Sequence, residues 1–137
     1  MSWTQAHIDE FRASGGKIGG RFEGRPVLLL TTTGRKSGRP HTTPMMYLQE
    51  EDGHLYVFAS KGGAPTNPHW YLNLVANPTV TVELGTDAFE ATARPLEGAE
   101  HDRVYARQSE LYPQFGDYQR KTERTIPVVE LIRSDGG

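Results

Sequence analysis

Residues 27–49 read "VLLLTTTGRKSGRPHTTPMMYLQ", two runs of apolar and β-branched residues on either side of a turn that Gly34 and Gly38 frame. Runs of this kind bounded by glycine are typical of strands joined by a hairpin. The stretch therefore predicts a strand over 27–33, a turn over 34–40 and a second, antiparallel strand over 41–49.

The same pattern recurs downstream of this hairpin. Glu51-Asp52-Gly53 is a hairpin turn of the Asp-Gly kind, and Gly85-Thr86-Asp87 separates two further β-rich runs. The additional strands are expected over residues 54–60, 79–84, 88–96 and 126–132. Six short strands, mostly joined by hairpins, predict a mainly β (α+β) fold: a small antiparallel β-barrel with two to four peripheral helices.

Three of the helices follow from local signals. Residues 3–13 carry apolar side chains at helical spacing. Asn67 is a good N-cap and Pro68 suits the first helical position, so a second helix is expected over 68–76. A third is expected over 98–111, where apolar residues again recur on one side.

An aromatic stretch precedes the last strand. Tyr112, Phe115 and Tyr118 recur every three residues, while Pro113 and Gly116 interrupt a helical pattern. We expect an irregular segment here. Two interpretations of its rings stay open: they pack in the core, or they project into a pocket with tyrosine hydroxyls as hydrogen-bond donors.

Length and composition limit the classes of function. The 137 residues suit one domain, with 1–26 as an N-terminal helix and glycine-rich lead-in. A formal net charge of -2 argues against a nucleic-acid partner, and the absence of cysteine excludes disulfides and thiolate metal sites. Neither a signal sequence nor a long apolar run is found, so a cytoplasmic protein is expected. The helix over 3–13 either packs on the barrel or makes a weak contact with a membrane surface.

Several catalytic motifs are absent or incomplete. Lys36-Ser37 is not preceded by the glycine spacing of a phosphate-binding Walker loop. Ser14 and Lys17 match the S-x-x-K string of acyl-transfer enzymes, but two glycines between them make a poor helix. The five histidines lack partners at the spacing of metal ligands, and no metal site is expected.

Three places can bind an anion. The turn carries Arg35, Lys36 and Ser37 between glycines, so backbone and side-chain donors meet there. Lys61-Gly62-Gly63 leaves backbone open to a ligand, and the helix that begins near Pro68 offers free N–H groups. The residues alone leave the turn as a solvated hairpin tip or an anion clamp.

Three stretches together carry a family resemblance: "TTTGRKSGRPHTTPMMYL" at 31–48, "ASKGGAPTNPHWYLNLVANP" at 59–78 and "LYPQFGDYQRKTERTIPVVEL" at 111–131. With them the chain resembles the deazaflavin-dependent nitroreductase and quinone reductase family. The resemblance covers residues from about Gly15 onward. It implies a split β-barrel and coenzyme F420 as the cofactor.

The resemblance also assigns roles by motif position. Arg35, Lys36 and Ser37 would hold the cofactor's phosphate or tail carboxylates. The rest of the cofactor would lie against His41, Thr42, Thr43, Pro44, Met45, Met46, Phe58, Ala59, Ser60, Lys61, His69, Trp70, Tyr71, Leu72 and Asn73. The acceptor pocket would be lined by Ser60, Tyr112, Phe115 and Tyr118, with the hydroxyls of Ser60, Tyr112 and Tyr118 stabilising charge or supplying a proton.

The implied activity is hydride transfer from the reduced deazaflavin to quinones, nitroaromatics or other activated conjugated compounds. Two alternatives remain at this point: a reductase or oxidase that uses flavin mononucleotide, and a non-catalytic deazaflavin carrier. His41 stands where relatives often have arginine, and Phe115 where they can have a pocket tyrosine, which makes bulky nitro substrates doubtful. Both a monomer and a homodimer remain open.

Overall fold

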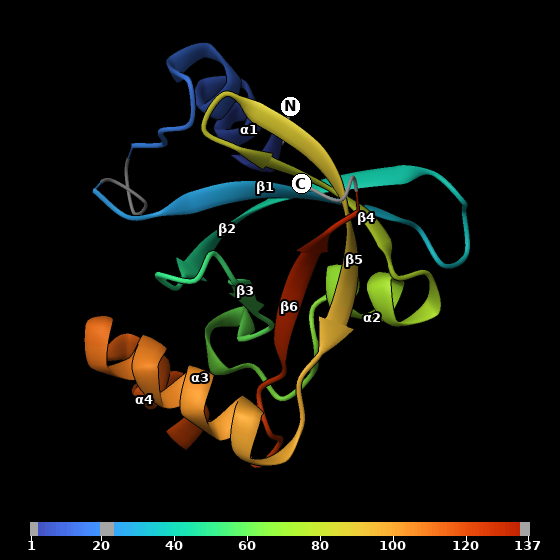
Figure 1. Cartoon of the computed structure of the whole chain (residues 1–137). Helices are drawn as coiled ribbons and strands as arrows, with labels where there is room; N and C mark the ends of the chain where they lie inside the picture. The colour runs from blue at the N-terminus through green and yellow to red at the C-terminus, as the bar shows by residue number, and fades with distance from the viewer. Residues whose placement is uncertain (1–2, 20–23, 135–137) are drawn as a thin grey trace.

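Six antiparallel strands close into a barrel in the order β1-β2-β3-β6-β5-β4, and β4 returns to pair with β1 (Figure 1). The computed structural model describes residues 3–19 and 24–134. Part of the predicted lead-in, 20–23, and the side chain of Trp3 therefore lie outside the described residues. The strands are β1 Val27–Thr33, β2 Pro40–Gln49, β3 Leu55–Phe58, β4 Thr79–Leu84, β5 Asp87–Pro95 and β6 Val128–Arg133.

The β1–β2 hairpin has the register that its turn dictates. Val27 pairs with Met46 at one end and Thr33 with Pro40 at the other. Within the turn, the Gly34 N–H donates to the Arg39 carbonyl at 2.8 Å, and Gly38, at φ 70°, donates to the Gly34 carbonyl at 2.9 Å. A positive φ of this size favours glycine. The predicted strand–turn–strand unit is confirmed.

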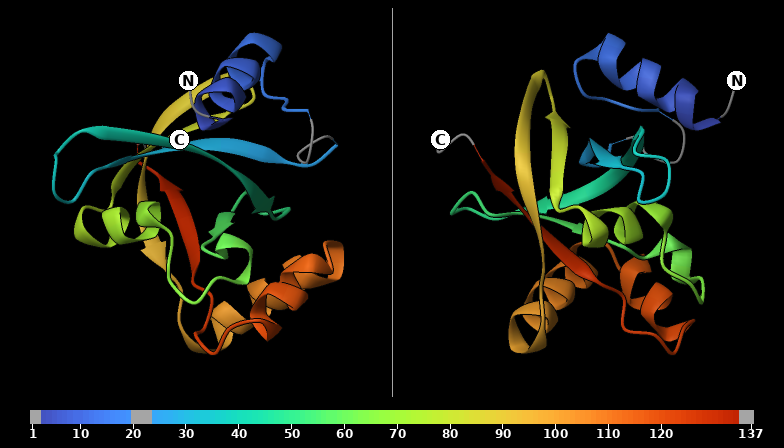
Figure 2. Two further views of the ribbon diagram at one scale, coloured as in Figure 1. Left: turned by 180° about the vertical axis from the view of Figure 1, so that it is seen from behind. Right: turned by 90° about the vertical axis from the view of Figure 1, so that its right-hand side faces the viewer.

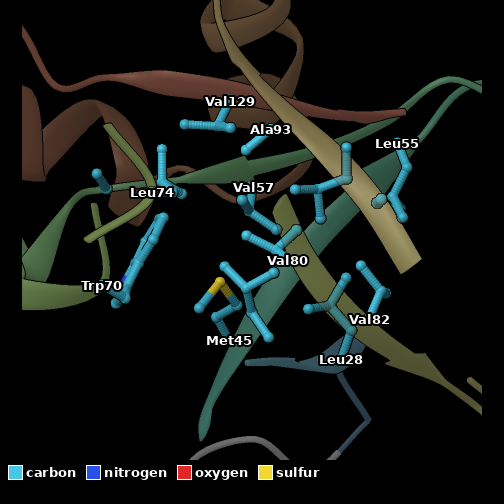
Figure 3. Close-up of a cluster of buried hydrophobic side chains, with 14 residues drawn as sticks. Leu28, Met45, Leu55, Val57, Trp70, Leu74, Val80, Val82, Ala93 and Val129 are labelled. Atoms are coloured by element: carbon cyan, nitrogen blue, oxygen red, sulfur yellow. The ribbon is translucent and has the colours of Figure 1, made fainter. Parts of the chain in front are cut away.

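The barrel interior holds one apolar cluster to which all six strands and α2 contribute. Leu28, Val57, Val82 and Val129 are fully buried in it. In Figure 3 the Trp70 ring lies at the side of the cluster, next to Leu74 on the same helix. Trp70 is therefore both a core residue and, as described below, a wall of the site.

Helices lie against the outside of the barrel at opposite ends (Figures 1 and 2). At one end, α1 buries Ile8 and Phe11 against Val27 and Leu29. At the other, α3 and α4 lie together and cover a second apolar cluster around Phe58. The helices are α1 Trp3–Ser14, α2 His69–Ala76, α3 Gly98–Leu111 and α4 Gln114–Arg120, with a short 3-10 turn η2 at Lys61–Gly63.

The apolar side chains Ile8 and Phe11 of α1 are thus buried against the barrel. Ile8 and Phe11 form a cluster with Ile18 and the start of β1. This arrangement confirms that residues 3–13 form a helix and that its apolar face packs on the barrel. Within the described ranges, no helix is long and apolar enough to span a bilayer.

The aromatic stretch is not irregular: residues 114–120 form α4. Pro113 lies at the N-cap, where its missing N–H breaks no helical hydrogen bond. Phe115 is 5% exposed, and its ring packs edge-on against Phe58 at 5.6 Å and Tyr118 at 5.3 Å between centroids. Burial of Phe115, with Tyr118 packed against it, outweighs the weak helix propensity that Gly116 introduces.

Three predicted boundaries differ from those of the structure. Asn67 does not cap α2, which begins at His69, because its Oδ1 accepts a hydrogen bond of 2.8 Å from Arg124. Strand β3 ends at Phe58 because Ser60 already has helical dihedral angles and begins η2. The last strand begins at Val128 rather than at 126.

A hydrogen bond from α3 fixes the position of α4. The Tyr105 hydroxyl donates to the Phe115 carbonyl at 2.5 Å, and the Tyr105 ring stacks on that of His101. Burial raises the pKa of Tyr105 to about 12. The phenol therefore remains neutral in the folded protein at a pH where it ionises in the unfolded chain.

This difference predicts a loss of stability in alkali. Tyr105 stabilises the fold fully below pH 10, its ordinary pKa, and that contribution is lost as the pH rises toward 12. Tyr105→Phe should lower the free energy of unfolding at neutral pH by about 1 kcal/mol, since one hydrogen bond is lost. Between pH 10 and 12, however, the variant should lose less stability than the wild type. Urea titrations across this range measure both effects.

The other tyrosines provide an internal reference for this comparison. Burial also raises the pKa values of Tyr47 and Tyr56, and their contribution is common to both proteins. If the free energy of unfolding falls by the same amount between pH 10 and 12 in the wild type and in Tyr105→Phe, Tyr105 is not the titrating group.

Candidate cofactor and acceptor site

Two adjoining cavities lie along β2 and α2, with volumes of about 720 and 470 Å³. Thr43 and Trp70 line both of them, so the two form one groove. The smaller cavity is lined by Gly34, Arg35, Lys36, Ser37, His41, Thr42, Thr43, His69, Trp70 and Asn73. The larger is lined by Arg25, Thr43, Pro44, Met45, Met46, Phe58, Ser60, Lys61, Gly62, Pro68, Trp70, Gln114, Phe115 and Tyr118.

The smaller cavity is electropositive. Arg35 and Lys36 from the β1–β2 turn face it together with His41, while α2 contributes His69 from its first turn. No aspartate or glutamate is among its lining residues. The start of α2 adds the positive end of a helix dipole. The formal net charge of the chain is -2, so this cavity concentrates positive charge locally.

Asn73 ties the basic turn to α2. Its Oδ1 accepts hydrogen bonds from the Arg35 backbone N–H at 3.2 Å and from Arg35 Nη1 at 3.0 Å. Its Nδ2 donates to Thr32 Oγ1 at 3.2 Å, and Asn73 is only 4% exposed. Asn73 thus orients the guanidinium before any ligand arrives. Such preorganisation reduces the entropy lost on binding.

Gly34 allows the turn to close over the cavity. A Cβ at this position would lie 2.5 Å from Ser37 Oγ and 2.8 Å from His41 Nε2. Both distances are shorter than any normal contact, so a side chain at 34 would displace two residues that line the smaller cavity. Glycine at 34 leaves this space to the Ser37 hydroxyl and the His41 ring.

The larger cavity has mainly apolar walls with polar groups at a few points. Met45 and Met46 come from β2, Phe58 from β3, and Trp70 from α2. Ser60, Lys61, Gln114, Tyr118 and Arg25 supply the polar side chains. Flat apolar walls with few placed polar groups are typical of sites for ring-shaped cofactors and substrates.

Arg124 holds the segment that carries Ser60 and Lys61. The guanidinium donates to the carbonyls of Ala59 at 3.2 Å, Ser60 at 2.8 Å and Ala64 at 2.8 Å, in addition to Asn67 Oδ1. Burial lowers the pKa of Arg124, and its hydrogen-bond partners are neutral oxygens. One side chain therefore connects the end of β3, η2 and the segment before α2.

The η2 turn depends on unusual backbone angles next to α4. Lys61 has φ 47°, a left-handed value that is uncommon outside glycine, and its Nζ donates to Thr66 Oγ1 at 3.3 Å. Gly63, at φ 84°, packs so closely that a Cβ there would lie 2.8 Å from the Tyr118 carbonyl. The turn and α4 thus share a close backbone contact.

Most of the predicted cofactor residues line the groove, but three do not. Ala59 lies buried in the barrel core, where its N–H donates to the Pro127 carbonyl. Tyr71 packs against the barrel cluster with its ring edge-on to Trp70, and Leu72 is partly buried. The helix period explains this placement, since Trp70 and Asn73 share one face of α2.

Three of the four predicted acceptor residues line the larger cavity, and one does not. Ser60, Phe115 and Tyr118 line the larger cavity, whereas Tyr112 is not among its lining residues. The Tyr112 ring instead packs against the cluster beneath α3 and lies under the guanidinium of Arg25, 5.7 Å from Cζ to the ring centroid.

Three further candidate functional residues are not predicted by the sequence. Arg25 and Gln114 line the larger cavity, and Arg124 holds η2. Arg25 precedes Pro26 in a glycine-rich stretch without a periodic pattern, and the other two lie in or after the segment predicted to be irregular. No local signal identifies a residue whose partners are distant in sequence.

The described residues contain no group of three or more histidine, cysteine, aspartate or glutamate side chains that could hold a metal ion.

Comparison with known proteins places this chain in a family. The model of the F420H(2)-dependent quinone reductase family matches residues 3–132. An F420H(2)-dependent quinone reductase of Mycobacterium tuberculosis is 43% identical over 96% of each chain. A solved F420-H2 dependent reductase is 45% identical, covering 78% of this chain and 94% of its own, with a TM-score of 0.71.

A second solved structure, described as a domain-swapped dimer, is 40% identical over 93% of this chain and 92% of its own, with a TM-score of 0.73. The matched residues include the hairpin, η2 and α4, the elements that form the groove. The chain belongs to the F420H(2)-dependent quinone reductase family.

Proposed function

We propose that this chain binds reduced coenzyme F420 in the groove and uses its hydride to reduce quinones. The observation that carries the proposal is the division of the groove into an electropositive cavity without carboxylates and an adjoining cavity with apolar walls. Nitroaromatic and other activated conjugated compounds are further candidate acceptors. Quinones are favoured because the family and a relative with 43% identity are named for them.

The residues present fit the cofactor. The phosphate and carboxylate charges of its tail require fixed cations, which Arg35 and Lys36 supply, with Arg35 already oriented by Asn73. Its planar ring requires flat apolar walls, which Trp70, Phe58 and Met45 supply. Gly62, where a Cβ would meet nothing within 4 Å, leaves backbone open to the larger cavity.

When bound, the reduced deazaflavin supplies a hydride. The hydroxyls of Ser60 and Tyr118 line the cavity in which the acceptor would lie. A hydroxyl aimed at the acceptor oxygen stabilises the negative charge that hydride arrival leaves there, and the Tyr118 hydroxyl can then donate its proton. A donor of this kind contributes roughly 2.7–4 kcal/mol in other enzymes.

Two substitutions relative to the family pattern affect different cavities. His41 lines the smaller cavity, so it bears on the cofactor's phosphate or tail. Phe115 lines the larger cavity and is packed between Phe58 and Tyr118, so it acts on the acceptor as an apolar wall without a hydroxyl.

A fluorescence assay tests the proposal against its alternatives. Reduced coenzyme F420 mixed with menadione and protein should regain the fluorescence of the oxidised cofactor at a rate proportional to protein concentration. Tight binding without recovery would support a carrier. A protein that purifies with bound flavin mononucleotide and has no affinity for the deazaflavin would contradict the proposal.

The basic turn can be tested by a double variant. Arg35→Ala with Lys36→Ala should raise the Kd of coenzyme F420 by about tenfold or more, because charge-assisted hydrogen bonds are lost. The fold should be unaffected, since both side chains are exposed. Arg39→Ala is the matched control, because Arg39 is an exposed cation on the same turn that lines neither cavity. Equal Kd values for the double variant and the control would remove the clamp assignment.

Arg124 can be tested as a positioning residue. Arg124→Gln removes a guanidinium that serves four oxygen acceptors, so we expect a loss of stability of about 2–4 kcal/mol and a fall in kcat for menadione. Arg124→Lys should recover part of the stability but little of kcat, because an ammonium cannot reproduce the planar fork. Arg120→Gln, an exposed position on α4, is the control. A parallel recovery of stability and kcat in Arg124→Lys would point to a purely structural role.

We also propose that the chain forms a homodimer. A relative with 40% identity that covers nearly the whole chain is described as a domain-swapped dimer. Light scattering on the purified protein should give twice the 15.3 kDa mass of one chain. A monomer mass at micromolar concentration would contradict the proposal.

A further inference from the structure

Arg25 is a cation of the larger cavity to which neither the family resemblance nor the basic turn gives a role. It lines that cavity together with Phe115, Tyr118 and Gln114. Arg25 and Lys61 are the two cations among the lining residues, and no carboxylate is present there. Within residues 3–19 and 24–134, no aspartate or glutamate lies within ion-pair distance of Arg25.

The position of Arg25 is held from two sides. The carbonyl of the next residue, Pro26, accepts a hydrogen bond of 3.2 Å from the Tyr47 N–H, which ties the backbone to β2. The guanidinium lies over the Tyr112 ring, 5.7 Å from its centroid. Arginine stacks well on aromatic faces, and this contact leaves its N–H groups free for a ligand.

The two cations lie against different parts of the site. Lys61 belongs to η2, and its Nζ already donates to Thr66 Oγ1. Arg25 lies over Tyr112, which ends α3 and leads into α4, the helix that contributes Phe115 and Tyr118 to the cavity. Arg25 is therefore associated with the acceptor residues, whereas Lys61 is associated with the predicted cofactor residues.

We propose that Arg25 is a catalytic residue that binds the acceptor oxygen on which negative charge develops, and that it makes acidic quinones preferred acceptors. The proposal rests on the proposed quinone reductase function. In the reaction the C5–H bond of the reduced deazaflavin breaks, and its hydrogen passes with both bonding electrons to the quinone, where it forms a new bond to a carbon or oxygen atom of the conjugated system. Two electrons pass to the quinone, the deazaflavin is oxidised, and one negative charge is left on a carbonyl oxygen of the quinone.

The guanidinium stabilises this anion and does not supply the proton. Arginine remains charged at any working pH, so the proton that completes the hydroquinone comes from a hydroxyl such as that of Tyr118 or from water. A permanent cation in a cavity with apolar walls acts more strongly than the same cation in water. A quinone that already carries a negative charge gains the same contact before reaction, and its binding should therefore depend on Arg25.

The test compares Arg25→Gln and Arg25→Lys with the wild type, each loaded with oxidised coenzyme F420. Arg133→Gln is the matched control, because the Arg133 guanidinium also lies over a ring, 4.5 Å from the Phe89 centroid, and lines neither cavity. The first readout is the Kd of a hydroxynaphthoquinone that is an anion at neutral pH, measured by calorimetry. The second is kcat/KM for neutral menadione with the reduced cofactor.

Arg25→Gln should weaken binding of the anionic hydroxynaphthoquinone by about 10- to 100-fold, the usual range for a charge-assisted hydrogen bond. It should lower kcat/KM for menadione by a similar factor and leave the Kd of coenzyme F420 unchanged. Arg25→Lys should keep part of the wild-type affinity for the anionic quinone and part of the wild-type kcat/KM for menadione. Arg133→Gln should match the wild type in both.

The outcomes separate the two proposals. If the wild type reduces menadione and Arg25→Gln binds the anionic quinone as tightly as the wild type, the assignment of Arg25 is overturned and the proposed function stands. If the wild type reduces no quinone, the proposed function fails. The calorimetric comparison still decides whether Arg25 binds an anion, because that measurement needs no turnover.

Discussion

The insertion of β6 between β3 and β5 closes the barrel, and the site depends on this closure. Strand β6 pairs with β3 on one side and β5 on the other, although α3 and α4 separate it from β5 in the sequence. The connection into β6 must therefore pass close to the end of β3. Arg124 lies in that connection, and its guanidinium reaches the carbonyls of Ala59, Ser60 and Ala64. The same constraint that completes the core thus positions η2 and places α4 beside it.

The residues that line the groove include cations but no carboxylates. The chain carries slightly more acidic than basic residues, yet neither cavity has a carboxylate among its lining residues. Many other arginines pair with acids on the outside of the barrel, as Arg12 does with Glu83 and Arg94 with Glu130. The cations of the groove are held instead by neutral groups: Arg35 by Asn73, and Arg25 by the face of Tyr112. Their positive charge therefore remains free to act on a ligand.

Core packing and site architecture share the same side chains. Trp70 packs against the barrel cluster and lines both cavities, and Phe115 packs between Phe58 and Tyr118 while lining the larger cavity. Side chains of this kind have little freedom to rotate because the surrounding core is closely packed. The apolar walls of the groove are accordingly rigid. We therefore expect substrate preference to depend on the polar residues that line the larger cavity, such as Ser60, Tyr118 and Arg25.

The sequence by itself determined the features that arise from contacts between near neighbours. The β1–β2 hairpin, its basic turn framed by Gly34 and Gly38, and the presence of six strands along the chain all follow from local patterns of residues, and so does the electropositive character of the turn. Only the tertiary structure decided where α4 forms, why Asn67 does not cap α2, and that Arg25 and Arg124 belong to the site. These features rest on contacts between residues far apart in the chain. Local propensity does not encode such contacts, and burial in the closed barrel outweighs it.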